Sequence, residues 1–195
     1  MNKNNISYVS VRYTKKDYQK LRLTLNSDDI TLEKAIKIFI DRIEGRFFEQ
    51  IRTLSNDYNQ NGFSIMALAC LLIETFAQFI KGLDDTRGVS RQEYIDFLMN
   101  SLDCFPTKAA AESFYSCIRC GILHQAQTKK NSALTFDEKY VIEYRGNFLK
   151  VSVDNFTEKL CEFFHRYCQQ LKEGGSDDNL LRSNFIKKMD YICNR

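Results

Sequence analysis

The sequence predicts a mainly α-helical protein, a bundle of five or six helices with one inserted β-hairpin. Apolar residues recur at spacings of three and four through most of the chain, as on the buried face of a helix. One proline and eight glycines among 195 residues leave few interruptions. The clearest strand signal is a pair of short segments around a glycine turn, near residues 140–153. The length suits a single domain over residues 1–195.

The composition is that of a soluble globular protein, with 44% apolar and 27% charged residues. The net charge of +3 is too small to indicate nucleic-acid binding by itself, although it is compatible with a local basic patch. An odd number of cysteines, seven, favours reduced thiols over a disulfide framework. The N-terminus lacks the apolar run of a signal peptide. We therefore expect a cytoplasmic protein, and we expect no cofactor.

Residues 1–30 are expected to form an N-terminal extension, in which Ile6–Tyr13 resembles a short edge strand. An apolar stripe from Leu32 to Leu54 then predicts one long helix. Gly45 interrupts the interior of this helix and is expected to bend or split it. The polar stretch "SNDYNQNG" that follows is expected to be a loop.

The next helix, from about Phe63 to Leu83, is apolar nearly all round and should be the central helix of the fold. Its most apolar run, Ile65–Ile73, is far shorter than the roughly 20 residues that cross a membrane, so we expect no membrane contact. Glu74 follows this run directly. Because a buried carboxylate needs a partner, Glu74 is expected to form an ion pair, and Arg119 is a candidate.

Two sequence patterns, one beginning with serine and one with asparagine, predict the first residues of two helices in the rest of the chain. Ser90 with Glu93 and Asn155 with Glu158 both match a capping box. Between these two helices, Pro106 and Thr107 open an alanine-rich helix that runs to about Gln125.

The β-hairpin is expected to be an insertion over residues 138–153, ahead of the helix at Asn155. A linker, "EGGSDDN", ends that helix. The last element is expected to be a C-terminal helix over residues 175–195.

Two cysteine–histidine triplets raise the question of a metal site. In each triplet the residues recur at helical spacing, so two helix faces meeting could supply zinc ligands. Structural zinc sites, however, usually place a CxxC on a turn, and buried cysteine commonly serves as a small apolar side chain. We therefore predict no metal site, with a zinc-stabilised interaction domain as an alternative. The triplets are Cys117, Cys120 and His124, and Cys161, His165 and Cys168.

Arg119 and His124 form an R-x4-H pair that suits phosphodiester chemistry. A histidine can take the proton of a ribose 2′-hydroxyl, and a guanidinium can hold a phosphate and its developing charge. The attacking 2′-oxygen belongs to the RNA, so no metal is needed. Lys129, Lys130 and Gln125 lie just beyond and are candidates for contacting the RNA.

The geometry of the pair depends on where the helix ends. Five residues correspond to about 140° of helical rotation, so Arg119 and His124 would line one cleft only if the helix ends or loosens near His124. The alternative for each residue is structural: an ion pair with Glu74 for Arg119, and a favourable interaction with the helix dipole for His124.

This arrangement resembles the HEPN superfamily, whose hallmark is an R-x4-6-H motif in an apolar setting near the end of a bundle helix. The resemblance covers about residues 30–171 and is carried by "FYSCIRCGILHQ". It implies a helical bundle that forms a homodimer, with two copies of the motif at one groove. Many members are metal-independent ribonucleases of toxin–antitoxin, abortive-infection and other defence systems. By this resemblance Arg119 and His124 would be the active pair.

The chain departs from the family pattern at Cys120, where HEPN nucleases usually carry a polar residue directly after the arginine. The resemblance therefore leaves a second function open, a non-catalytic module that binds RNA, nucleotides or an antitoxin or defence-system partner. In both cases Glu74 and Cys120 are expected to support Arg119.

Overall fold

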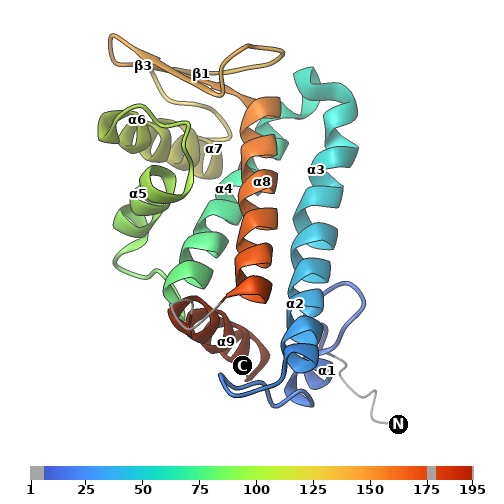
Figure 1. Cartoon of the computed structure of the whole chain (residues 1–195). Coiled ribbons are helices and arrows are strands. Elements are labelled where there is room, and N and C mark those ends of the chain that lie inside the picture. The colour runs from blue at the N-terminus through green and yellow to red at the C-terminus, as the bar shows by residue number, and fades with distance from the viewer. Residues whose placement is uncertain (1–6, 175–178, 195) are drawn as a thin grey trace. The chain divides into compact units, whose positions relative to one another are not determined.

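The computed structural model describes residues 7–174 and 179–194, and within them the chain forms seven helices and a three-stranded sheet (Figure 1). The mainly helical class is confirmed. The described residues form more helices than the five or six predicted, and the sheet has a third strand in addition to the two of the predicted hairpin. The helical segments are α1 (Lys15–Gln19); α2 (Asp29–Ile43), continued by the π-helical turn η1 (Glu44–Phe48) and α3 (Glu49–Leu54); α4 (Tyr58–Lys81), preceded by the 3-10 turn η2 (Ser55–Asp57); α5 (Ser90–Ser101); α6 (Lys108–Ser113), continued by the π-helical turn η3 (Phe114–Arg119) and α7 (Cys120–Gln125); α8 (Val153–Glu173); and α9 (Asn179–Asn194).

The chain divides into two compact units, and both α4 and α8 contribute residues to each. The first unit comprises Met1–Gln50, Gln78–Asp85 and Arg166–Arg195. The second comprises Ile51–Ala77 and Thr86–His165. The candidate residues Glu74, Arg119 and His124 therefore all belong to the second unit.

The core of the first unit is built around one aromatic ring of α2. The ring centroid of Phe39 lies 4.5 Å from that of Phe79, 5.5 Å from that of Phe185 and 6.0 Å from that of Tyr167. Tilted and edge-on pairs at these distances add to the hydrophobic burial. The apolar face predicted for α2 is thus the face that packs.

The predicted edge strand at the N-terminus is wrong. Ile6 lies outside the described residues, and the following segment forms one isolated bridge, Tyr8 with Thr14, before α1 begins. The bend expected at Gly45 takes the form of the π-helical turn η1. A Cβ atom there would lie 2.4 Å from Val11 Cγ2, so the segment before α1 packs against a backbone that only glycine leaves open.

The loop expected at "SNDYNQNG" is also wrong, since α4 begins at Tyr58. Asp57 accepts a hydrogen bond from the Gln60 amide (3.1 Å), which caps the helix start. A Cβ atom at Gly62 would lie 2.7 Å from the ring of Phe136, so this glycine admits the ring to the helix surface. This polar segment is therefore helical because a cap and a tertiary contact stabilise the first turns of α4.

Helix α4 is apolar enough over Gln60–Lys81 to cross a membrane by length and composition, with a mean hydropathy of 1.9 in its most apolar window. The core helix of a globular protein meets the same criterion, and half of this window is buried inside the protein. In the second unit the buried side chains of α4 include Ile65, Met66 and Phe76. The prediction that α4 is a core helix agrees with this burial.

Aromatic rings also fill the core of the second unit. Phe76 of α4 lies 6.2 Å from Phe97, 5.2 Å from Phe163 and 5.9 Å from Phe164, between ring centroids. The ring of Phe114, at the start of η3, lies 4.9 Å from that of Phe156. These contacts fix η3 against α8 within this unit.

The predicted hairpin is present as β2 (Ile142–Arg145) and β3 (Phe148–Ser152), which pair antiparallel. Its two turn residues, Gly146 and Asn147, both have positive φ, as a tight two-residue hairpin turn requires. A third strand, β1 (Ser132–Thr135), pairs parallel with β3 and gives the order β1-β3-β2. The four residues of β1 lack the alternation of apolar and polar side chains that would have predicted a strand.

Both predicted capping boxes are wrong. Ser90 is the first residue of α5 rather than its cap, and α8 begins at Val153, ahead of Asn155. The side chain of Asn155 donates instead to the carbonyls of Glu138 and Tyr140 (2.8 and 2.9 Å). Thr107 does cap α6, accepting from the Ala110 amide (3.2 Å). Within the predicted linker, residues 175–178 lie outside the described part, and the C-terminal helix starts at Asn179.

Candidate functional site

The R-x4-H motif begins at the end of a π-helical turn. Arg119 is the last residue of η3, and the five following residues through His124 belong to α7. Helix α7 ends at Gln125, because Ala126 adopts a left-handed conformation with φ 52°. The expectation that the helix loosens and ends near His124 is therefore met. Single π-helical turns within helices often occur at functional sites.

The guanidinium of Arg119 is paired with the carboxylate that follows the apolar run of α4. Arg119 Nη2 lies 3.0 Å from Glu74 Oε2, and the two side chains are 15% and 23% exposed. Nη1 lies 3.9 Å from the sulfur of Cys120, and the guanidinium carbon lies 5.3 Å from the ring centroid of Tyr115. The contact suggested between Arg119 and Glu74 is thus present, in a largely buried setting.

Two hydroxyl groups complete the surroundings of Glu74. Thr86 and Ser90 donate hydrogen bonds to its Oε1, at 2.5 and 3.2 Å. Burial alone would raise the pKa of Glu74, but the hydrogen bonds from Thr86 and Arg119 outweigh it and hold the pKa below its ordinary value. Glu74 is therefore a carboxylate at neutral pH, with both oxygens occupied.

Arg119 remains a cation in this environment. Burial works against its charge, but the hydrogen bonds to Glu74 and Cys120 outweigh burial, so the pKa of Arg119 is raised. Its Nε is buried without a hydrogen-bond partner among the described residues. The site therefore holds a compact ion pair of zero net charge, with one donor of Arg119 still unused.

The neighbouring groups Cys70 and Tyr94 are uncharged. Both are almost fully buried. Burial raises the pKa of the Cys70 thiol to about 12 and raises the pKa of Tyr94 well above its ordinary value. These two side chains therefore give the ion pair an uncharged setting and supply no second acid or base.

His124 lies on the surface near the end of α7. In the part of the chain that the structure describes, its ring makes no hydrogen bond, and no hydrogen bond joins it to Arg119. The two motif residues thus share one short helix but do not contact each other. An exposed imidazole without a hydrogen-bond partner is accessible to a ligand.

The loop after α7 folds back on the motif. The Lys129 amide donates a hydrogen bond to the carbonyl of Cys117 (3.0 Å), which lies two residues before Arg119 in the sequence. This bond fixes the path of the loop. A Cβ atom at Gly121 would lie 2.5 Å from the Gln127 carbonyl oxygen, so the close approach depends on this glycine. The candidate RNA-contacting residues Gln125, Lys129 and Lys130 are all exposed.

The sulfur and imidazole groups form no obvious metal centre. Among the described residues there is no group of three or more histidine, cysteine or acidic side chains that could hold a metal ion. Within the second predicted triplet, Cys161 Sγ lies 4.0 Å from His165 Nδ1. All seven cysteines are free thiols, and Cys70, Cys168 and Cys193 are buried.

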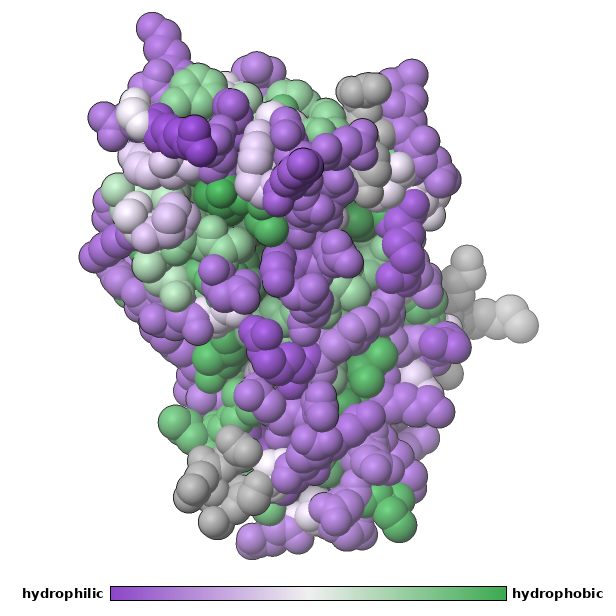
Figure 2. All heavy atoms as spheres, turned by 45° about the horizontal axis from the view of Figure 1, so that its top comes forward, coloured by the Kyte–Doolittle hydropathy of each residue, from purple (hydrophilic) through white to green (hydrophobic). Residues whose placement is uncertain are grey.

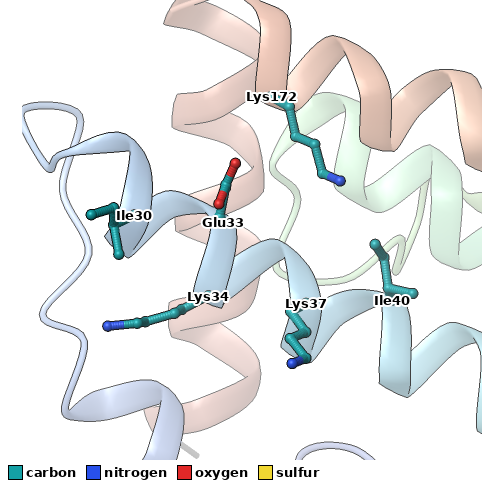
Figure 3. Close-up of a pocket in the computed structure, with 6 residues that line it drawn as sticks. All are labelled: Ile30, Glu33, Lys34, Lys37, Ile40 and Lys172. Atoms are coloured by element: carbon teal, nitrogen blue, oxygen red, sulfur yellow. The ribbon is translucent and has the colours of Figure 1, made fainter.

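A shallow pocket of about 380 Å³ lies in the first unit, between α2 and the end of α8. Figure 3 shows that the ammonium groups of its lysines do not meet at a common centre: Lys34 and Lys37, about one turn apart on the same face of α2, extend in different directions, and Lys172 comes from α8. None of the motif residues lines it. We therefore assign the candidate site to the ion pair and the end of α7.

The sequence does not predict the hydrogen bonds of Thr86 and Ser90 to Glu74. The pattern at Ser90 predicts a helix cap instead, and no local pattern marks Thr86. The signal that predicted the contact between Glu74 and Arg119 was a single carboxylate directly after nine apolar residues. No protein-family model matches the chain, and comparison with curated proteins and with solved structures gave no match.

Proposed function

We propose that this protein is a HEPN-like, metal-independent endoribonuclease that acts as a homodimer, in a defence or toxin–antitoxin system. The observation that supports the proposal is the arrangement of the motif: a charged, oriented Arg119 and an exposed His124 on one helix that ends at Gln125. RNA is the substrate that this pair of groups suits, because its 2′-hydroxyl supplies the nucleophile.

In the proposed reaction, His124 removes the proton of a 2′-hydroxyl, and the 2′-oxygen attacks the adjacent phosphorus. The bond to the 5′-oxygen of the next nucleotide breaks, and that oxygen takes up a proton from water, while His124 returns the proton that it removed to the solvent. The products are a 2′,3′-cyclic phosphate and a 5′-hydroxyl. Arg119 stabilises the charge that develops on the phosphate oxygens. Glu74 acts as a positioning residue, since it holds the guanidinium without touching the RNA.

A second copy of the chain would bring another exposed His124 to each Arg119. The surface of α4 supports a self-contact in this region, because Phe63 and Leu71 are exposed on an apolar helix, and Leu71 lies one turn before Glu74. Figure 2 shows, on one face of the molecule, that hydrophobic residues reach the surface in several patches between hydrophilic ones. A partner that covers the α4 surface would bury exposed apolar side chains.

One observation favours a second function, a non-catalytic module that binds RNA or a protein partner. Glu74 neutralises Arg119, and the arginine side chain is only 15% exposed. Cys120, beside it, is a weak hydrogen-bond donor where a nuclease of this family would carry a polar group. In this case the ion pair stabilises the fold, and ligands contact the exposed residues of the loop.

The test is RNA cleavage by the purified protein in the presence of a metal chelator, with the His124→Ala variant. We expect the variant to lose about 100-fold or more of the cleavage rate while its thermal unfolding is unchanged, because His124 is exposed. His165→Ala is the matched control, since His165 is the other histidine and is also exposed. Equal cleavage by His124→Ala and wild type contradicts the proposal. Intact RNA with measurable binding favours the second function.

A further inference from the structure

The three-stranded sheet of the second unit has one face on which the side chains are exposed or half-buried. In the antiparallel pair, Glu143 lies opposite Lys150 and Arg145 lies opposite Phe148. Residues directly opposite each other point to the same face, and alternate residues point to the other. The other face of β3 carries Leu149, which is fully buried. The four paired residues therefore share the solvent side of the sheet.

One end of this sheet gathers positive charge. Because β1 and β3 are parallel, the residues before β1 lie beside the start of β3, and the Leu149 amide donates to the Asn131 carbonyl (2.9 Å). Lys129 and Lys130 therefore lie at the same end of the sheet as the hairpin turn. The acidic connection over residues 136–141 joins the strands at the opposite end.

The charges at this end are poorly balanced. Glu143 is the one carboxylate of the exposed face, and it pairs with Arg145 (3.2 Å) and Lys150 (3.0 Å). Lys129 and Lys130 are exposed and have no ion pair within the described residues. Four cations against one carboxylate leave a local charge of +3 at this part of the sheet. A local excess of positive charge favours the binding of anions.

An aromatic ring stands among these cations. Phe148 is 41% exposed at the first position of β3, beside Arg145. Exposed rings bordered by lysine and arginine are the usual means of binding single-stranded nucleic acid, in which a base stacks on the ring and the phosphates contact the cations. A duplex would hide its base faces from Phe148. The combination favours a single strand over a duplex or an acidic peptide.

We propose that this end of the sheet is a binding site for single-stranded RNA, with Phe148 stacking on a base and Lys129, Lys130 and Arg145 contacting phosphates. The site is joined to the motif, since the Lys129 amide donates to the Cys117 carbonyl. An RNA strand held by the loop would continue toward the end of α7. This inference rests on the proposed function for its identification of the bound strand as the substrate.

The stacking arm of the test measures binding of a fluorescent oligouridylate of about 12 nucleotides to the full chain carrying His124→Ala, which prevents cleavage. We expect Phe148→Ala to weaken binding about five- to tenfold and Phe148→Trp to restore it. Tyr8→Ala, which removes an exposed ring in the first unit, is the matched control and should bind as the parent does. A merely structural role for Phe148 would not be rescued by a larger aromatic ring.

The charge arm compares Lys129→Ala/Lys130→Ala with Lys34→Ala/Lys37→Ala, two exposed lysines on α2. We expect the first pair to weaken binding and to lower the slope of log affinity against log salt by about 1.4, since each phosphate contact on a single strand contributes about 0.7. The second pair should leave the slope unchanged.

The outcomes separate the inference from the proposed function. Equal binding by the Phe148→Ala variant and its parent, tighter binding of an RNA duplex of the same length, or no binding by the parent at low salt would each overturn the inference. Binding that depends on Phe148, in a wild-type protein that leaves RNA intact, supports the inference and contradicts only the nuclease proposal. Cleavage that needs His124 but is unchanged by substitution of Phe148, Lys129 and Lys130 supports the nuclease proposal and contradicts the inference.

Discussion

Removal of the Glu74 carboxylate tests whether the buried ion pair stabilises the fold. Glu74→Ala leaves the Arg119 guanidinium, which is 15% exposed, without its counterion, and leaves Thr86 and Ser90 without their acceptor. Breaking a fully buried pair costs about 3–5 kcal/mol. Since both side chains keep some contact with water, we expect the lower end, about 3 kcal/mol.

The assay is urea unfolding followed by circular dichroism. With a denaturant dependence of about 2 kcal/mol/M, a loss of this size lowers the unfolding midpoint by about 1.5 M. Glu112→Ala is the matched control, because Glu112 faces Arg91 at 3.6 Å and the side chains are 40% and 59% exposed. A surface pair of this kind contributes less than about 1 kcal/mol.

A double variant measures the coupling between the two charges. Replacement of Glu74 and Arg119 together by methionine removes the pair without leaving a buried charge, so the double variant should be much more stable than Glu74→Met or Arg119→Met alone. The reasoning is refuted if Glu74→Ala costs no more than Glu112→Ala, or if the double variant loses the sum of the two single losses.

Two further predictions follow from the same site. Because the pKa of Glu74 in the folded protein lies below its ordinary value of 4.5, its stabilisation is complete above that pH and is lost as acid protonates the carboxylate. Between about pH 6 and 3, wild type should therefore lose more stability than Glu74→Gln, and parallel loss in thermal unfolding scans would contradict this. Gly121→Ala places a Cβ atom 2.5 Å from the Gln127 carbonyl and should destabilise by about 1–3 kcal/mol and weaken RNA binding. Gly88→Ala, with open space around it, should lower the melting temperature slightly through its positive φ and leave binding unchanged.

The predicted elements that agree with the structure are those with a local cause. The stripe from Leu32 to Leu54 forms helix with an irregularity at Gly45, and Thr107 caps α6, since both depend on residues within one or two turns. The hairpin is likewise local, because Gly146 and Asn147 adopt the backbone conformation that a tight turn demands.

The two predicted capping boxes failed because each side chain has a second hydrogen-bonding option. Ser90 can cap a helix, but a nearby carboxylate offers its hydroxyl a stronger, charge-assisted bond. Asn155 can also cap, but it instead satisfies two carbonyls of the loop before β2. Sequence spacing cannot rank such options, because the competing partner is distant in the chain.

The sequence by itself determined the helical class, the hairpin and the short segment in which Arg119 and His124 occur, because periodicity, turn residues and spacing are local properties. Only the tertiary structure decided that Glu74 meets Arg119, that Thr86 and Ser90 complete the cluster, and that β1 pairs with β3. These contacts join residues 12 to 45 positions apart. Such contacts form when burial of the apolar faces brings distant segments together, and buried charges and unpaired strand edges then require partners.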